Sequence, residues 1–338
     1  MQSIFDNKSI LVIGGTGTIG DGIVKKLLKE HNPHVVRIFS RDEYKQFVMQ
    51  QELAAYTNVR YLLGDVRDKE RLYRAMKGID IVFDAAALKH VPACEYNPFE
   101  AVKTNVLGTQ NVIETAIENG VERVIYTSSD KAVSPTNTMG ATKLLAERLI
   151  SAADYHKGGD RPIFCAVRFG NVMGSRGSVI PLFQQQIAQQ RHITLTHTDM
   201  TRFMMSLSQA VDLTLKAASM AMGGEIFVLK MPTVLLSDLA SVIIETESSK
   251  LAVPADDIKT EVTGLRPGEK MYEELMSEAE AERAWETEGM FIIPPVTHDN
   301  GTHYDGVVKV YSKDYSSENK KPLTKEELYR LLQQEELI

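Results

Sequence analysis

The sequence predicts a doubly wound parallel α/β sheet, followed by a smaller C-terminal α/β lobe. Apolar, β-rich runs alternate with helical segments through the first half of the chain. These runs are apolar throughout, which is typical of strands that are buried on both faces. Repeated strand, helix and strand imply a parallel sheet with right-handed crossovers. The predicted strands are residues 9–13, 35–39, 59–62, 79–84, 123–127 and 163–168.

Two helices between these strands are predicted from their apolar spacing. Residues 17–30 place Ile23 and Leu27 on one face, and the Asn-Pro pair that follows ends the helix. Residues 108–119 have the same spacing, with Gly120 as a C-cap.

The second half is less regular and predicts a lobe over the carboxyl edge of the sheet. Helices are predicted over residues 138–153, 180–190, 206–222, 237–247 and 324–334. Isolated strands are predicted over 226–229 and 259–262, and the polar stretch 297–321 is predicted to be a loop or tail.

Composition indicates an ordinary globular protein. The 338 residues include 43% hydrophobic and 25% charged residues, and the formal net charge is −7. We expect no nucleic-acid partner, because the chain is mildly acidic and has no long basic run. We expect no membrane span or signal peptide, because no apolar run approaches about 18 residues. Two cysteines, Cys94 and Cys165, make no disulfide framework, which favours the reducing cytoplasm.

A glycine-rich turn follows the first strand directly and opens the first helix. Its glycines are three apart, which suits a tight turn where backbone N–H groups approach a pyrophosphate. This strand–turn–helix context predicts a Rossmann-type dinucleotide-binding domain over residues 1–168, with helices from about 200–224 returning to it. Residues 169–338 form the second lobe and tail. The predicted phosphate contacts are Gly14, Thr16, Gly17, Thr18, Ile19 and Gly20.

The end of the second strand indicates which dinucleotide binds. Ser40 and Arg41 offer a hydroxyl and a guanidinium, which suit the 2′-phosphate of NADP. Asp42 comes next and keeps NAD possible, since NAD-binding folds place an acidic residue here. Further cofactor contacts are predicted after the third and fourth strands, at Asp65, Val66, Ala85 and Ala86.

The stretch 127–143 (TSSDKAVSPTNTMGATK) follows the fifth strand and enters a long helix. Met139 and Lys143 are four residues apart and share one face of that helix. Here the sequence resembles the extended short-chain dehydrogenase/reductase superfamily, which carries Ser or Thr after this strand and Tyr-x-x-x-Lys on the helix.

Further blocks narrow the resemblance. The chain looks like the UDP-N-acetylglucosamine 4,6-dehydratases of polysaccharide biosynthesis, over roughly residues 5 to 275. The blocks are specific in combination: AAALKHVP at 85–92, EYNP at 95–98, EAVKTN at 100–105, RFGNV at 168–172, GSRGSVIPLF at 174–183, DMTRF at 199–203 and RPGEK at 266–270.

The resemblance implies a dehydration through a transient 4-ketone, with bound NADP taking and returning a hydride. It implies Asp130 as the acid for the 6-hydroxyl, Lys131 as the base at C5 and Lys143 at the nicotinamide ribose. Met139 departs from the superfamily tyrosine, and a thioether cannot act as acid or base. One branch of these dehydratases also carries Met, and Ser129 is expected to relay the 4-hydroxyl proton. We expect desolvation to raise the pKa of Asp130 and lower the pKa of Lys131.

The resemblance also implies UDP-N-acetylglucosamine as the partner, and Arg266 with Glu269 as its diphosphate and ribose anchor. Arginine binds phosphate bidentately. Lys89 and Asn105 are expected near both cofactor and substrate, and Arg176 near the substrate. The other expected substrate contacts are His90, Asn171, Ser178, Val179, Arg202 and Met204. The eight histidines show no metal-ligand spacing, so no metal is expected.

Other readings stay open. Retention at C5 is favoured over inversion. A nucleotide-sugar 4-epimerase needs the oxidation base but has no use for Asp130 and Lys131, which is the reverse of this pattern. A non-catalytic dinucleotide-sensing regulator has no reason to keep both of these residues together with Lys143. A homo-oligomer, dimer or hexamer, is expected.

Overall fold

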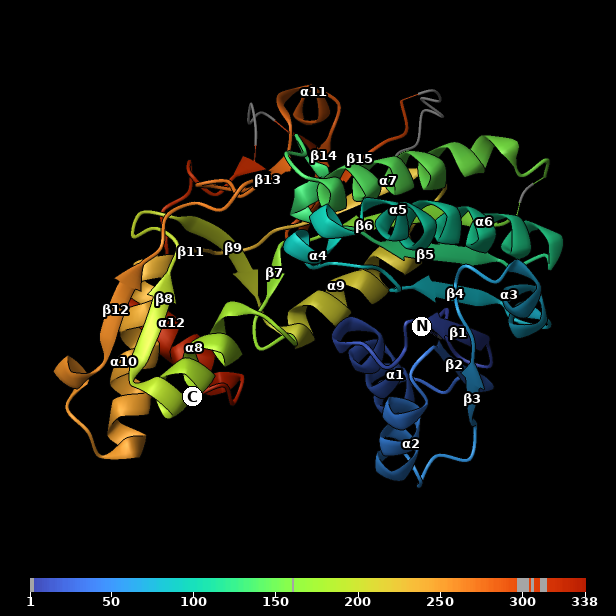
Figure 1. Ribbon diagram of the computed structural model, residues 1–338. Coiled ribbons are helices and arrows are strands. Elements are labelled where there is room, and N and C mark those ends of the chain that lie inside the picture. The colour runs from blue at the N-terminus through green and yellow to red at the C-terminus, as the bar shows by residue number, and fades with distance from the viewer. Residues whose placement is uncertain (1–2, 160, 297–303, 305–306, 311–314) are drawn as a thin grey trace.

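A computed structural model describes residues 3–159, 161–296, 304, 307–310 and 315–338 of the chain. Within these residues, a ten-stranded sheet runs in the order β16-β14-β15-β10-β6-β5-β4-β1-β2-β3 (Figure 1). The strands are β1 Ser9–Ile13, β2 Val35–Ser40, β3 Val59–Leu63, β4 Ile81–Asp84, β5 Arg123–Thr127, β6 Ile163–Arg168, β10 Glu225–Leu229, β14 Trp285–Glu286, β15 Met290–Ile293 and β16 Val308–Lys309.

The part of the sheet from β3 to β10 is parallel, which confirms the predicted doubly wound fold. The chain order reverses between β1 and β4, and a ligand crevice forms at such a point. The strands β15, β14 and β16 add an antiparallel edge. The sheet therefore draws four strands from beyond residue 168, and the division of the chain into two domains there stays a prediction.

Helices cover both faces of the sheet. On one face α1 packs against α9, and on the other α3 and α7 pack against α6 (Figure 1). The helices of this part are α1 Thr18–Glu30, α2 Glu43–Glu52, α3 Lys69–Met76, α4 Val91–Tyr96, α5 Pro98–Ala101, the π-helix η1 Val102–Leu107, α6 Gly108–Glu118, the 3₁₀ turn η2 Asp130–Ala132, α7 Thr138–His156 and α9 Leu207–Met220.

The second lobe has its own core, where α8, α10 and α12 meet. Outside the main sheet, the short strands pair as β11-β9-β7, β12-β8 and β13-β17. Of the elements below, β13, α11 and β17 pack into the core of the main sheet. The elements are β7 Asn171–Val172, α8 Val179–Gln190, β8 His192–Leu195, β9 Thr201–Met205, β11 Thr233–Leu235, α10 Leu236–Leu251, η3 Ala255–Asp257, β12 Lys259–Val262, β13 Glu274–Met276, α11 Glu278–Ala281, β17 Tyr315–Ser316 and α12 Lys325–Gln334.

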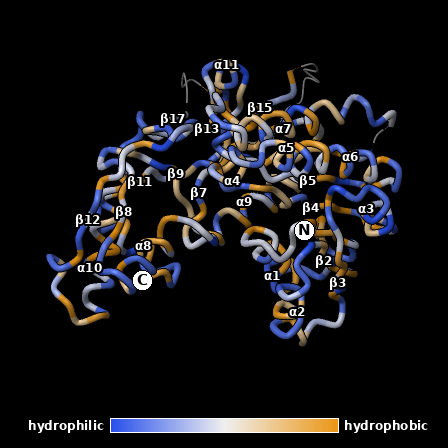
Figure 2. The backbone as a smooth tube through the Cα atoms, in the orientation of Figure 1, coloured by the Kyte–Doolittle hydropathy of each residue, from blue (hydrophilic) through white to orange (hydrophobic). Residues whose placement is uncertain are grey.

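The predicted boundaries differ from the observed ones mainly at helix ends. The helix predicted to end at residue 153 continues to His156, and the one predicted over 237–247 runs from Leu236 to Leu251. The prediction of a loop or tail over 297–321 is wrong at β16 and β17, which both pair with other strands, and part of that stretch lies outside the described residues. Hydrophobic residues concentrate in the central strands, whereas α11 is hydrophilic (Figure 2). Among the described helices, none is long and apolar enough to cross a membrane.

A buried ion network joins β6 of the sheet to the helices α7 and α11. Arg168, at the end of β6, donates to Glu147 on α7 at 2.7 and 3.0 Å. It also donates to Glu280 on α11 at 3.0 Å through each of two nitrogens. Only 1% of Arg168 is exposed. The conspicuous block around Arg168 therefore serves the core, because a buried guanidinium needs this many acceptors.

Candidate active site

A cavity of about 920 Å³ opens at the carboxyl ends of the strands, at the point where the chain order reverses. The loops after β1, β2, β3, β4, β5 and β6 line it, so segments far apart in the sequence meet there. It brings together most of the residues predicted as site residues: Gly14, Thr16, Gly17, Thr18, Ile19, Gly20, Ser40, Arg41, Asp65, Val66, Ala85, Ala86, Lys89, His90, Ser129, Asp130, Lys131, Met139, Lys143, Asn171 and Ser178.

The glycine turn gives the cavity a backbone cradle. Gly14 has φ +73°, and a Cβ on it would lie 2.8 Å from the carbonyl of Ala85. A Cβ on Gly20 would lie 2.4 Å from the Gly14 oxygen. Gly17 is the N-cap of α1, so the helix begins at the cavity wall with its first N–H groups unpaired within the helix. The cradle fits a pyrophosphate, because only backbone without side chains approaches this closely.

The end of β2 places Arg41 at the cavity, whereas the next residue, Asp42, pairs with Lys45. The Arg41 side chain is 55% exposed, 3.7 Å from Asp65. Asp42 caps α2 by accepting from the Lys45 amide at 3.0 Å, and its carboxylate also pairs with the Lys45 ammonium at 2.8 Å. Arg67 holds Asp65 at 2.7 Å. Arg41 and Asp42 thus both line the cavity, but the Asp42 carboxylate is already paired with Lys45.

Arg176 lies at the phosphate end of the cavity. Its amide donates to the Thr18 hydroxyl at 3.5 Å, and its guanidinium donates to the Thr16 carbonyl at 3.4 Å. Lys89 donates to the Arg176 carbonyl at 2.9 Å. The segment 173–178 thus reaches the glycine turn. Arg176 therefore lies beside the glycine turn, and its expected contact with the substrate stays a prediction.

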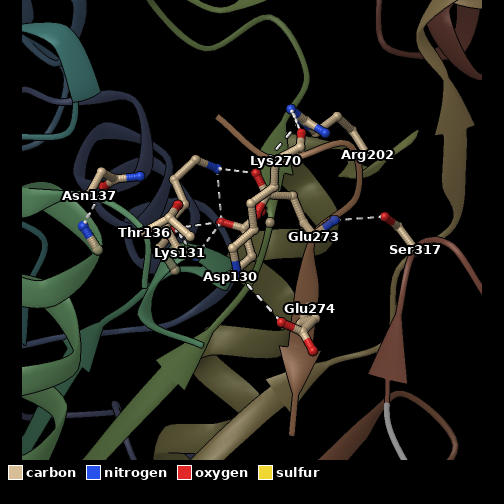
Figure 3. A network of polar contacts seen from close by, with 12 residues as sticks. Asp130, Lys131, Thr136, Asn137, Arg202, Lys270, Glu273, Glu274 and Ser317 are labelled. Atoms are coloured by element: carbon tan, nitrogen blue, oxygen red, sulfur yellow. Dashed lines mark hydrogen bonds and ion pairs between the residues drawn. The ribbon is translucent and has the colours of Figure 1, made fainter. Parts of the chain in front are cut away.

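The strongest polar cluster of the cavity follows β5. Ser129 donates to Asp130 Oδ1 at 2.6 Å, and the Lys131 ammonium lies 3.1 Å from the same oxygen. Asp130 is 1% exposed, and its Oδ2 has no hydrogen-bond partner among the described residues. A third group, which the sequence analysis missed, is Glu273 from the turn before β13. Its Oε1 lies 3.6 Å from Lys131 Nζ (Figure 3). A buried acid in a separate motif has no local sequence signal.

The expected lowering of the Lys131 pKa is wrong for the protein in this state. Burial lowers the pKa of this lysine, but the carboxylates of Asp130 and Glu273 outweigh it, so the pKa is raised. Burial also raises the pKa of Glu273. Lys131 is therefore charged at rest, and it must lose its proton before it can act as a base.

Lys143 lies at the floor of the cavity, with its ammonium donating to the Thr127 carbonyl at 2.8 Å. Burial lowers its pKa to about 8. The nearby Asp84 is 1% exposed, and burial raises its pKa to about 6. Lys143 Nζ lies 4.6 Å from the ring centroid of Tyr126. That phenol is buried, with a pKa raised well above its usual value, so it does not replace the missing tyrosine base.

Met139 lines the cavity and also packs in a small apolar cluster with Cys94 and Ala101. It is 3% exposed. Leu88 and Val91 pack against the same cluster. The side chain therefore forms an apolar wall at the position where the superfamily places its acid–base group. Among the described residues, no group of His, Cys, Asp and Glu could hold a metal ion.

Six predicted site residues lie outside the described cavity wall: Asn105, Val179, Arg202, Met204, Arg266 and Glu269. Asn105 is 1% exposed and bonds both backbone groups of Leu88 and the Thr142 hydroxyl, so it supports the loop after β4. Met204 is in the core of the second lobe, and Val179 packs against it. The substrate contacts of these residues stay predictions.

Arg202 and the block 266–270 lie close to the stretch 127–143. Arg202 donates to the carbonyls of Thr201 and Lys270, which fixes the turn before β13. Thr136 and Asn137 both donate to the Gly268 carbonyl at 3.0 Å. Arg266 is exposed, and its amide donates to the Glu269 carboxylate at 3.1 Å.

The fold and this site define an extended short-chain dehydrogenase/reductase. The parallel sheet, the glycine turn before α1, and Ser129 with Lys143 around one cavity are the parts that define the class. The polysaccharide biosynthesis protein family matches residues 10–295, and the chain belongs to that family.

Several relatives are similar over nearly their full length. An uncharacterized membrane protein of Methanocaldococcus jannaschii is 50% identical over 99% of this chain and 98% of its own. A UDP-glucose 4-epimerase of Rickettsia typhi is 43% identical over 97% and 96%. An inverting UDP-N-acetylglucosamine 4,6-dehydratase of Campylobacter jejuni is 42% identical over 86% and 84%. The X-ray structure of Pen from Bacillus thuringiensis, 51% identical, covers 99% of this chain and 100% of its own with a TM-score of 0.93.

Proposed function

We propose that this protein is a UDP-N-acetylglucosamine 4,6-dehydratase. The observation that carries the proposal is the cluster of Ser129, Asp130 and Lys131 on the cavity wall, which an apolar Met139 also lines. An acid and a base side by side suit the removal of H5 and the departure of the 6-hydroxyl as water. The Campylobacter relative, 42% identical, has this activity in its name.

The cofactor of the proposal is NADP. The backbone cradle around Gly14 and Gly20 would hold the pyrophosphate, and Arg41 would pair with the 2′-phosphate. Asp42 is committed to Lys45, which disfavours NAD. Lys143 would hold the nicotinamide ribose. When bound, NADP supplies a hydride acceptor that oxidises C4 and then returns the hydride to C6.

The chain's own residues handle the protons. Ser129 passes the 4-hydroxyl proton to Asp130, to which it is already bonded at 2.6 Å. Asp130 becomes a neutral acid by this step and later gives the proton to the departing 6-hydroxyl. Lys131, once neutral, takes H5, which the 4-ketone makes acidic, and returns a proton to C5. The 4-hydroxyl proton thus leaves in water, and Lys131 ends as it began.

The specific product of the proposed reaction is UDP-2-acetamido-2,6-dideoxy-4-hexulose with retention at C5, made for surface-glycan or deoxyamino-sugar synthesis. The Campylobacter relative is named as inverting, so inversion is the direct alternative. Cytoplasmic location and a homo-oligomer belong to the same proposal.

The test is a product assay. Purified protein is incubated with UDP-N-acetylglucosamine in deuterated water and followed by mass spectrometry and proton NMR. Loss of one water from the sugar supports the dehydratase, and the C5 coupling gives its stereochemistry. A product of unchanged mass with inverted C4 would identify an epimerase, the activity named for the Rickettsia relative. Cofactor binding without turnover of any UDP-sugar would identify a regulator.

A further inference from the structure

Lys131 lies between two buried carboxylates from different parts of the chain. Asp130 Oδ1 is 3.1 Å from its nitrogen and Glu273 Oε1 is 3.6 Å from it. Glu273 is 4% exposed and is not among the described residues that line the cavity. Lys131 therefore lines the cavity. It also contacts the buried Glu273 (Figure 3).

The proposed proton route does not yet include an acceptor for the ammonium proton of Lys131. Asp130 must be ionised at the start, because it receives the 4-hydroxyl proton through Ser129. Lys131 must be neutral to take H5, yet it is an ammonium at rest. If Lys131 gave its proton to Asp130, Asp130 could no longer accept the proton of the 4-hydroxyl. A second acceptor beside Lys131 resolves this conflict.

We propose that Glu273 is a positioning residue that takes up and stores the proton of Lys131 during turnover. The step breaks one N–H bond of the Lys131 ammonium and forms one O–H bond on Glu273, leaving a neutral amine and a neutral acid. No oxidant or external base is needed. After C5 is reprotonated, Glu273 returns its proton to Lys131. The inference rests on the proposed dehydratase function.

Around Glu273, burial and the Asp130 carboxylate favour a bound proton and together outweigh the nearby cations. The charged groups that face it are Asp130 and Lys131 from η2, Arg202 from β9 at 3.8 Å, and Lys270 from the preceding turn. Its backbone is fixed by Ser317, whose hydroxyl accepts the Glu273 amide at 3.0 Å and whose amide donates to the Glu273 carbonyl at 2.9 Å. Burial raises the pKa of Glu273, which brings its proton affinity nearer to that of a lysine.

The experiment compares the pH dependence of H5 exchange in the wild type and in Glu273→Gln. In the wild type the proton stays within the cluster, so the rate is flat between pH 6.5 and 8. In Glu273→Gln the proton of Lys131 must leave to solvent. We expect a rate about 10²-fold lower at pH 6.5, rising about tenfold per pH unit toward pH 8. Lys143 titrates near the top of this range in both proteins, so the ratio of the two rates is the readout.

Glu274→Gln is the matched control. Glu274 is the next residue along β13 and pairs with Lys270 at 3.4 Å. Its profile should run parallel to that of the wild type. Glu273→Asp keeps an acceptor and should restore a flat profile at a lower rate. Cofactor content and circular dichroism verify that each variant is folded.

Separate outcomes overturn the inference and the function beneath it. A wild type that removes no water from UDP-N-acetylglucosamine overturns the proposed function, and the inference falls with it. In a dehydrating wild type, a Glu273→Gln profile that is merely lower and parallel to that of the wild type overturns the inference alone. A ratio of the two rates that stays constant from pH 6.5 to 8 is the signature of a structural role.

Discussion

The Ser129 hydroxyl donates to Asp130 Oδ1 over 2.6 Å, and both residues line the cavity. This bond joins the group expected to touch the 4-hydroxyl to the group expected to protonate the 6-hydroxyl. Under the proposed function, this bond would carry the 4-hydroxyl proton from Ser129 to Asp130. It would thereby supply the proton route that the usual tyrosine provides and Met139 cannot.

Ser129→Ala removes this relay and should slow oxidation at C4. We expect the single-turnover rate of nicotinamide reduction, followed by its absorbance, to fall about 10²-fold or more. Ser129→Thr keeps the hydroxyl and should stay near the wild-type rate. Equal rates for the alanine variant and the wild type would remove Ser129 from the proton route.

Lys131→Ala should abolish deuterium incorporation at C5, because it removes the ammonium group that pairs with Asp130 in the cavity. Lys131→Arg is the informative companion. It keeps the positive charge but cannot become neutral, so it should also be inactive in exchange. Normal exchange in Lys131→Ala would sink the assignment of the base. Activity in Lys131→Arg alone would indicate a purely electrostatic role.

Met139→Leu should leave turnover within a few-fold of the wild type. The new side chain has nearly the same volume and preserves the apolar cluster with Cys94 and Ala101. The native protein with Met139 should be active, so activity should not require the Met139→Tyr substitution. A native protein without activity that is rescued only by Met139→Tyr would instead favour a regulator or a decayed enzyme. Steady-state assays of the three proteins distinguish these cases.

Asp84→Asn should raise the stability of the fold at neutral pH. The folded pKa of Asp84 is about 6, above its unfolded value of 3.8, so ionisation opposes folding above that value. The penalty is absent below pH 3.8, grows between pH 3.8 and 6, and is complete above pH 6. The upper bound of this penalty is about 3 kcal/mol. The stability gained by Asp84→Asn is smaller than this bound, because the variant also loses the attraction to Lys143.

Urea unfolding of the wild type and Asp84→Asn at pH 5 and pH 8 tests this sign. The stability gained by the variant should be larger at pH 8. A gain that is equal at both values, or larger at pH 5, would contradict the assigned pKa.

The parallel sheet could be predicted because its signals are local. Continuous apolar runs, a glycine turn between a strand and a helix, and their alternation appear directly in the chain. The cavity followed from the same order, since the carboxyl ends of parallel strands meet at one edge. The residues predicted around it, from Gly14 to Lys143, come from loops at that edge.

The sequence by itself determined the parallel strands between residues 9 and 168, the glycine cradle and the succession Ser129, Asp130 and Lys131, because each depends on neighbours in the chain. Only the tertiary structure decided that Glu273 faces Lys131 from a distant part of the chain, that Arg168 serves the core, and that β15, β14 and β16 extend the sheet. Lys131 and Glu273 are 142 residues apart, so no local sequence pattern predicts that they meet. The same folding fixed the charge of Lys131, since a pKa depends on burial and on nearby charges that the chain brings together only in three dimensions.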